Sequence, residues 1–276
     1  MLAPQRHAHI LERLRATGAV RVSDLMHELG VSDMTVRRDL ESLETGGHLV
    51  KVHGGATLLR DSASHEPGFD AKRSLELAAK LAIARVAAGL VEPGMAVAVS
   101  AGTTTFEVCR HLLQVPRLTV VTNSVPAADV LYHSGRPDQT IILTGGVRTP
   151  SDALVGPFAV SALRSVNVDI VFMGVHGMHP RAGFTTPNML EAETDQALIE
   201  TGGRLVVTAD HTKWGVTGVS TIERLSRADI VISDAGLSPE ARERLAAEAE
   251  LVVAEGPPNA TRTFPRRSLA GTVVGA

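Results

Sequence analysis

Only one of the 276 residues is a cysteine, Cys109. A single cysteine excludes an internal disulfide and any metal site built from several thiolates. Cys109 lies three residues after Phe106 and three before Leu112, and this helical spacing predicts a buried thiol rather than a reactive one. The eleven histidines are scattered, and the nearest to a ligand pair, His176 and His179, lie in a loop without a partner cysteine. We expect no metal and no cofactor.

Long apolar runs are also missing. No stretch of about 18 residues is uninterruptedly apolar, and the first residues mix charges into an amphipathic pattern. We therefore expect neither a secretion signal nor a membrane partner, and a cytoplasmic location. The hydrophobic content of 44% over 276 residues is enough for one sizeable core and a smaller unit, which predicts two domains.

Net charge gives little indication of a nucleic-acid partner. The whole chain carries −3. Residues 1–60 hold eight Lys/Arg and seven Asp/Glu, a net charge of +1, and the remainder holds −4. A DNA-binding role must therefore depend on where the charges lie.

Three short helical patterns occupy the first part of the chain. The first ends at Gly18, as at a left-handed cap, and the second begins after Ser23 as N-cap and ends at Gly30. Ser32 is the expected N-cap of the third helix. The apolar stripe of that helix, at i, i+4 and i+7, consists of Val36, Leu40 and Leu43. Three helices with a four-residue turn between the last two predict a helix-turn-helix.

The outer face of the third helix is the candidate DNA reader. At about 100° per residue, Arg38 lies nearly opposite the apolar stripe, and we expect it to enter the major groove together with Thr35. Arg37 lies to the side, where Asp33 and Glu41 are each four residues away, so we expect it to contact phosphate or to lock the helix surface. The expected DNA-facing residues are Ser32, Met34, Thr35, Arg37, Arg38, Ser42, Lys51 and His53.

A glycine-rich ribbon follows this helix. After residues 46–47, HLVKVHGGATLL alternates as two strands turned at residues 54–55, which makes the unit a winged helix with Lys51 and His53 beside the DNA backbone. An alternative interpretation treats the arginines as solvated residues on a helix that packs against another protein. That alternative leaves the capped turn and the wing unexplained.

The segment LERLRATGAVRVSDLMHELGVSDMTVRRDLESLETGGHLVKVHGGA closely resembles the N-terminal domain of the DeoR/GlpR family of bacterial transcriptional regulators. That domain carries VS-x-x-T-[IV]-RRDL-x-x-LE-x-x-G, followed by a basic residue and HGGA, and every part of the pattern is present here. The resemblance implies a domain that binds double-stranded operator DNA.

Residues 59–74 are polar with Gly and Pro, and predict a linker between domains at 1–58 and 75–256. Seven apolar runs follow, MAVAVS, LTVVTN, TIILTGG, VDIVFMGV, RLVVTAD, ADIVISD and ELVVAE, and helical stretches alternate with most of them. This pattern predicts an α/β fold: a Rossmann-like, largely parallel sheet covered on both faces. Residues 257–276 are expected to form a flexible tail without a role.

Ligands of such sheets bind outside the carboxyl ends of the strands. The first strand ends in SAGTTT, where Gly102 permits a tight turn and the three threonines open a helix whose free N–H groups suit a phosphate. Alternatively, the threonines only cap that helix. The residues expected at this rim are Ser100, Gly102, Thr103, Thr104, Thr105, Asn123, Ser124, Gly145, Gly146, Asp152, Gly174, His176, Glu191 and Lys213. Without G-x-x-x-x-G-K-[ST] or G-x-G-x-x-G, a small phosphorylated polyol is favoured over a nucleotide.

The order GTTT, TNS, GG, GVHG, GFTTPNMLEAE and DHTKW also resembles the effector domain of the same family, so the resemblance covers about residues 6–255. It implies a fold similar to ribose-5-phosphate isomerase and a sugar phosphate or related metabolite as effector. Gly102 to Thr104 then match the phosphate loop, and Lys213 matches the lysine of D-x-[ST]-K. Glu191 and Glu193 occupy the region of the isomerases' catalytic glutamate.

Sugar-phosphate isomerisation is therefore the rival hypothesis, since Glu191 or Glu193 with Lys213 supplies part of the required acid–base set. The isomerases follow the fourth strand with an acidic loop of the type D-G-A-D-E, whereas this chain has MGVHGMHP. Glu191 also fits a first-turn helix acid. We expect no catalytic residue and no enzyme, but a repressor of carbohydrate-metabolism genes that responds to a phosphorylated sugar as a homodimer or homotetramer.

Overall fold

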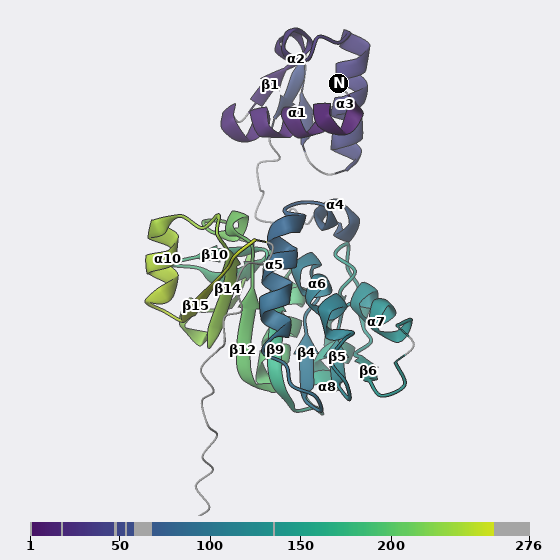
Figure 1. Cartoon of the computed structure of the whole chain (residues 1–276), viewed down its shortest axis with the longest axis vertical. Helices are drawn as coiled ribbons and strands as arrows, with labels where there is room; N and C mark the ends of the chain where they lie inside the picture. Colours follow the sequence, from purple (N-terminus) through teal and green to yellow (C-terminus); the bar gives the residue numbers. More distant parts are fainter. Residues whose placement is uncertain are drawn as a thin grey trace, which may run out of the picture.

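The computed structural model describes residues 2–17, 19–46, 49–52, 54–57, 68–134 and 136–256 (Figure 1). His53, most of the expected linker and the expected tail lie outside the described residues. Within the described part of the chain, no helix is both long and apolar enough to cross a membrane.

The N-terminal unit is the expected winged helix-turn-helix. Its elements are α1 (Ala3–Thr17), β1 (Ala19–Arg21), α2 (Val22–Leu29), α3 (Asp33–Thr45), β2 (Val50–Val52) and β3 (Gly55–Thr57). Both caps of the turn are confirmed, because Gly30 has φ +64° and the Ser32 hydroxyl accepts a hydrogen bond from the Thr35 N–H at 3.3 Å. The apolar stripe of α3 is buried as expected and packs with α1, α2 and β3.

The wing has one strand more than the sequence predicts. Strand β1 pairs with β3 in the antiparallel order β1-β3-β2. The Val22 N–H donates to the Gly54 carbonyl at 2.9 Å, so strand pairing fixes where α2 begins. Ser23 is therefore not the N-cap of α2; Arg21 occupies that position without a side-chain hydrogen bond, and the Ser23 hydroxyl donates to Asp24.

A seven-stranded parallel sheet forms the centre of the C-terminal unit, in the order β15-β14-β12-β9-β4-β5-β6. All seven apolar runs of the sequence form its strands: β4 (Ala96–Val99), β5 (Thr119–Thr122), β6 (Thr140–Leu143), β9 (Val168–Gly174), β12 (Gly202–Thr208), β14 (Ile230–Asp234) and β15 (Glu250–Ala254). The chain runs outward from β4 through β5 and β6, and then continues on the other side of β4 with β9. This reversal places the switch point of the sheet between β4 and β9.

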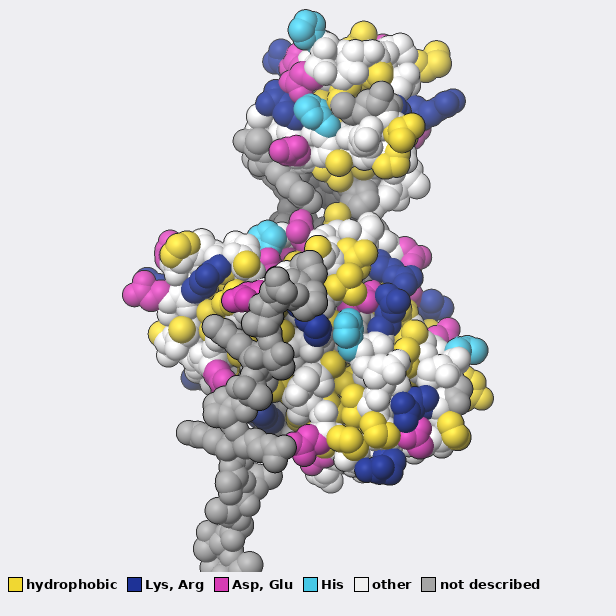
Figure 2. Space-filling model, in the orientation of Figure 1, with side chains coloured by type: hydrophobic (Ala, Val, Ile, Leu, Met, Phe, Trp, Pro, Cys, Tyr) yellow, Lys and Arg dark blue, Asp and Glu magenta, His cyan; other side chains and the backbone are white. Residues whose placement is uncertain are grey.

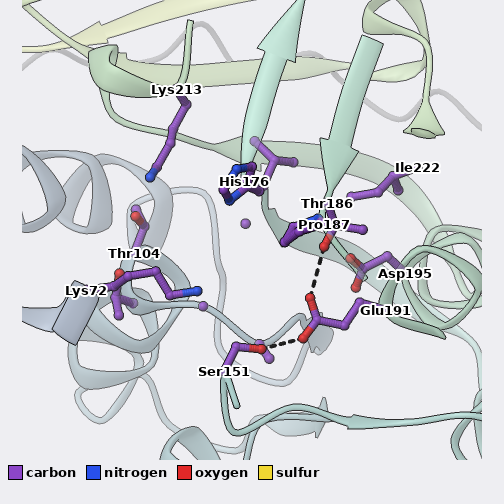
Figure 3. Close-up of a pocket in the computed structure, with 15 residues that line it drawn as sticks. Lys72, Thr104, Ser151, His176, Thr186, Pro187, Glu191, Asp195, Lys213 and Ile222 are labelled. Carbon is purple, nitrogen blue, oxygen red and sulfur yellow. Dashed lines mark hydrogen bonds between the residues drawn. The ribbon is translucent and has the colours of Figure 1, made fainter. Parts of the chain in front are cut away.

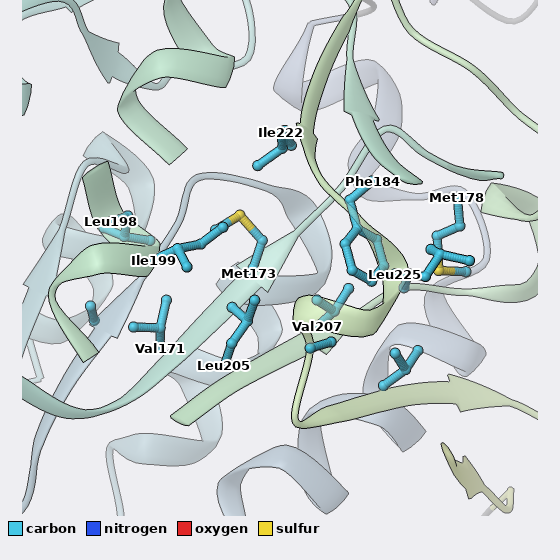
Figure 4. Packing of buried hydrophobic residues seen from close by; sticks show 14 of the residues in the cluster. Val171, Met173, Met178, Phe184, Leu198, Ile199, Leu205, Val207, Ile222 and Leu225 are labelled. Atoms are coloured by element: carbon cyan, nitrogen blue, oxygen red, sulfur yellow. The ribbon is translucent and has the colours of Figure 1, made fainter. Parts of the chain in front are cut away.

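Helices cover both faces of this sheet (Figure 1). They are α4 (Phe69–Arg73), α5 (Leu77–Ala88), α6 (Thr103–Leu112), α7 (Val125–Tyr132), α8 (Pro157–Leu163), α9 (Met189–Glu200) and α10 (Pro239–Ala246). Alternate strand residues enter two separate cores, as period-two alternation requires. Val97 packs with α5, α6 and α7, whereas Ala98 packs with α8, α9 and α10. Figure 4 shows the second core, where Met173 and Val207 of adjacent strands lie near Phe184.

Shorter elements complete the rim of the sheet. They are the hairpin of β7 (Val147–Arg148) and β8 (Leu154–Val155), the antiparallel sheet of β10 (Gly177–His179), β11 (Gly183–Thr186) and β13 (Ser220–Glu223), and the 3-10 helices η1 (His211–Lys213) and η2 (Leu225–Arg227). Cys109 is fully buried on α6, as the sequence predicts, and burial raises its pKa to about 12.

Candidate DNA-binding surface and effector pocket

Helix α3 is fixed against α1 by a buried carboxylate. Asp39, 4% exposed, accepts hydrogen bonds from Arg6 Nε at 2.6 Å and Nη2 at 2.9 Å, and His7 Nε2 lies 3.2 Å away. Burial raises the pKa of Asp39, but the hydrogen bonds and charges of Arg6 and His7 hold the pKa below its usual value. The aspartate of the RRDL motif is thus an anchor for the recognition helix.

The two arginines of α3 differ in their partners. Arg37 Nε donates to the Asp33 carboxylate at 2.6 Å, which is one of the two pairings that the sequence predicts. Arg38 is exposed and makes no hydrogen bond or ion pair among the described residues. The structure places Arg38 on the outer face with Met34, which is 76% exposed, and Ser42 is also exposed. An exposed ion pair is weak, so Arg37 also remains able to turn towards a phosphate.

The wing is joined to the recognition helix through Lys51. Its N–H donates to Glu44 at 2.9 Å, and its ammonium lies 3.8 Å from Glu41 and 3.9 Å from Glu44. Basic and acidic side chains are interspersed on the face of the molecule drawn in Figure 2. Lys51 thus links the wing to α3 through two glutamates of that helix.

A pocket opens at the switch point, beyond the carboxyl ends of β4 and β9. Its empty space is about 620 Å3, which includes open solvent at the mouth; small-molecule sites span roughly 300–1,000 Å3. The lining residues are Lys72, Ala101, Gly102, Thr103, Thr104, Ser151, Gly174, Val175, His176, Thr186, Pro187, Glu191, Asp195, Lys213 and Ile222.

One wall of the pocket is the start of α6. Gly102 occupies the N-cap position with φ +150°, and Thr103 and Thr104 present the first N–H groups of a ten-residue helix. The Ser100 hydroxyl accepts from the Gly174 N–H at 2.9 Å and so ties the ends of β4 and β9 together. Free N–H groups and the positive end of the helix dipole favour an anion at this place.

Lysines gather at the same wall. The whole chain has four lysines, and Lys72 on α4 and Lys213 on η1 both line the pocket (Figure 3). Lys80 is buried behind them, and its ammonium donates to the Lys72 carbonyl at 2.6 Å. Burial, with the nearby charges of Lys213 and Lys72, lowers the pKa of Lys80 to about 8, against the opposing charges of Asp210 and Glu76.

The opposite wall carries two carboxyl groups of α9, Glu191 and Asp195 (Figure 3). Glu191 accepts hydrogen bonds from the hydroxyls of Thr149 at 2.8 Å, of Ser151, and of Thr186 at 3.0 Å. Asp195 is 8% exposed, and burial, together with the charge of Glu191, raises its pKa well above the usual value. The pocket therefore has a cationic wall and an acidic wall.

Half of the expected effector residues line this pocket: Gly102, Thr103, Thr104, Gly174, His176, Glu191 and Lys213. Ser100 and Thr105 lie beneath the α6 loop, and Ser124 caps α7. Asn123 braces the loop from the side, and Asp152 is paired with Arg148 at 2.7 Å. Gly145 and Gly146 have positive φ, and Gly146 lies against the backbone of Val155 in strand β8.

Sequence reasoning missed several lining side chains. Lys72 falls within the expected linker, but residues 69–73 form α4, whose Phe69 ring packs edge-on against Phe106 of α6 at 5.5 Å. The guanidinium carbon of Arg73 lies over the Phe106 ring, 4.8 Å from the ring centre. Asp195 lies four residues after Glu191, and this spacing places both on the same face of a helix. Nothing in the sequence showed that this face is buried.

Comparisons with known proteins agree with this architecture. Residues 6–62 match the DeoR-like helix-turn-helix domain, and residues 76–235 match the DeoR C terminal sensor domain. The chain is 35% identical to the uncharacterized HTH-type transcriptional regulator YgbI of Escherichia coli, over 91% of this chain and 97% of that protein. It is 33% identical to a putative aga operon transcriptional repressor from another strain of Escherichia coli, over 87% of this chain and 90% of that protein. The chain belongs to the DeoR family of helix-turn-helix transcriptional regulators.

Solved structures give a weaker likeness. Ribose 5-phosphate isomerase A from Methanocaldococcus jannaschii aligns with a TM-score of 0.36 and 17% identity, over 49% of this chain and 53% of that chain. The chain thus matches about half the length of this isomerase, and at this score the likeness supports no conclusion about function.

Proposed function

We propose that the protein represses carbohydrate-metabolism genes by binding operator DNA through α3 and the wing, and that a phosphorylated sugar in the pocket controls this binding. The observation that carries the proposal is the convergence of the α6 N-terminus with Lys72 and Lys213 on one wall. A phosphate needs donors and positive charge, and this wall supplies both. The name of one relative as a repressor supports the direction of control.

Domain organisation and assembly are part of the proposal. We assign residues 1–58 to DNA binding and residues 75–256 to sensing, with α4 joining the sensing unit. A winged helix gains specificity from two copies on paired half-sites, so a homodimer or homotetramer in the cytoplasm is the working form. For control to occur, the effector must bind the free and the DNA-bound arrangements with different affinity.

Isomerase activity is disfavoured by the acidic wall. A general base needs a carboxylate free to take a proton from carbon. Glu191 already accepts from three hydroxyls, which hold its carboxylate in place. This arrangement fits binding better than proton abstraction, so we assign no catalytic residue.

The effector site is tested by thermal unfolding of the full chain with a panel of sugar phosphates. We expect phosphorylated sugars to raise the unfolding temperature, and Lys213→Ala and Thr104→Ala to reduce the effect. Arg164→Ala, which removes an exposed charge at the end of α8, is the matched control. Stabilisation by unphosphorylated sugars or nucleotides alone would contradict the phosphate site.

A further inference from the structure

The two walls of the pocket have opposite charge. The cationic wall consists of the α6 start with Lys72 and Lys213, and the acidic wall consists of Glu191 and Asp195 on α9 (Figure 3). A phosphate satisfies only the first wall. The ligand must therefore present a second group, of different chemistry, to the acidic wall.

Asp195 is the unsatisfied member of that wall. It is 8% exposed and lines the pocket, yet it makes no hydrogen bond or ion pair within the described part of the chain. Its carboxyl oxygens are not among the sealed side-chain atoms without a partner in the described residues, so they are accessible from the pocket. The neighbouring carboxylate of Glu191 is instead held by three hydroxyls, two of which belong to Ser151 and Thr186 of the pocket lining. The missing partner of Asp195 is thus expected to come from the ligand.

We propose that the pocket binds a phosphorylated amino sugar, with its phosphate at the α6 start between Lys72 and Lys213 and its ammonium group paired with Asp195. This inference rests on the proposed function of the pocket and names its ligand class. Asp195 is then the residue that determines specificity, because it distinguishes an amine from a hydroxyl at the same sugar carbon.

Charge favours the ammonium over a hydroxyl. The lysines that line the pocket lie on the opposite wall, and the hydroxyls of Thr149, Ser151 and Thr186 are already used by Glu191. A neutral hydroxyl can donate one hydrogen bond to Asp195, but it carries no positive charge to favour the ionised carboxylate. An ammonium supplies a positive charge and three donors without an acceptor, which matches two adjacent carboxyl groups.

Binding of the ammonium also changes the protonation of Asp195. Burial and Glu191 hold the pKa of Asp195 high when the pocket is empty, and a cation within hydrogen-bond reach favours the ionised form. Besides Glu191 on the same helix, the charged or titratable residues that line the pocket are Lys72, His176 and Lys213 from other elements. Formation of the ammonium–carboxylate pair therefore favours loss of a proton from Asp195, and a neutral sugar phosphate lacks the positive charge that would drive this loss.

Matched pairs of ligands test the inference with the full chain. The probes are glucosamine 6-phosphate against glucose 6-phosphate, and galactosamine 6-phosphate against galactose 6-phosphate. We expect the amino member of at least one pair to bind at least about tenfold more tightly, a difference of about 1.4 kcal/mol. Asp195→Asn should abolish this preference, whereas Lys213→Ala should weaken both members of the pair.

Calorimetry in two buffers of different ionisation enthalpy gives a second readout on the unmodified chain. We expect proton release with the amino sugar phosphate and less release with its neutral counterpart. Equal affinity within each pair, or no binding of either amino sugar phosphate, overturns the inference. If neutral sugar phosphates still bind through Lys213, the proposed function stands; if no sugar phosphate binds at all, both fail.

Discussion

The side-chain oxygen of Asn123 accepts a hydrogen bond from the Ala101 N–H at 2.8 Å. The amide nitrogen of Asn123 donates to the Leu154 carbonyl at 3.3 Å, so this residue joins the loop after β4 to strand β8. Asn123 is 2% exposed and does not line the pocket. It therefore holds the loop after β4, where we propose the phosphate site, without itself lining the pocket.

Asn123→Ala tests that role. The substitution leaves the partly buried Ala101 N–H and Leu154 carbonyl without these partners, so we expect the free energy of unfolding to fall by about 1–3 kcal/mol. Urea denaturation measures this loss, and sugar-phosphate affinity should fall as well. Ser238→Ala, which removes the N-cap of α10 away from the pocket, should cost about 1 kcal/mol without changing ligand affinity. Unchanged ligand binding in Asn123→Ala would contradict the positioning role.

The Arg6–Asp39 pair predicts how the N-terminal unit responds to acid. The pKa of Asp39 is lower in the folded chain than in the unfolded chain. Its stabilising contribution is therefore present above the unfolded pKa of about 3.9, and is lost as the pH falls through the folded value. Arg6→Ala removes the main counter-charge from a buried carboxylate. As the pH is lowered, the variant should therefore lose its helical far-UV signal at a higher pH than the unmodified chain. Identical acid transitions in both proteins would show that the pair contributes nothing.

Lys80 predicts a second rise of stability with pH, in the alkaline range. Burial holds its pKa at about 8 in the folded chain, below the usual lysine value of 10.5, so the unfolded state binds more protons between these values. Stability should rise with pH across this range, by up to about 3 kcal/mol. Lys80→Met lacks the titrating group and should lack this rise. Urea unfolding at intervals from pH 7 to 10 compares the two, and parallel curves would contradict the burial of a charged ammonium.

The two arginines of α3 should behave differently in DNA binding. Arg38→Ala should cost about 1–3 kcal/mol of operator affinity and reduce base preference, because this side chain is free to reach base edges. Arg37→Ala should weaken binding to all sequences similarly, since its expected contact is phosphate. Competition with base-substituted operators distinguishes these outcomes. An unchanged base preference in Arg38→Ala would place the reading residue elsewhere.

The sequence predicted those elements that depend on neighbouring residues along the chain, such as apolar strands and helix caps. The seven apolar runs became the parallel sheet, and Ser32 and Gly30 cap the turn before α3 as expected. The errors come from tertiary contacts. Strand β1 forms because it pairs with β3. This pairing makes α2 begin at Val22, with Arg21 rather than Ser23 in the N-cap position.

The pocket shows the same division. The sequence predicted the threonines at the start of α6 and Lys213 as pocket residues, because they follow the ends of strands. It did not predict Lys72, because the composition of that segment is typical of a linker. The position of Lys72 depends on the packing of Phe69 on Phe106, and the periodicity of the local sequence does not reveal this contact. The role of Asp195 depends on its burial beside Glu191, and burial on one face of α9 is a property of the assembled core.

The most direct test of DNA binding under effector control is a titration of fluorescently labelled promoter DNA with the full chain, with and without sugar phosphates. We expect specific binding whose affinity changes at least about tenfold with the correct sugar phosphate, a coupling of about 1.4 kcal/mol. Lys213→Ala should bind the same DNA and lose the response. A chain that binds no genomic fragment at low salt, yet turns over a pentose or hexose phosphate, would contradict the proposed function.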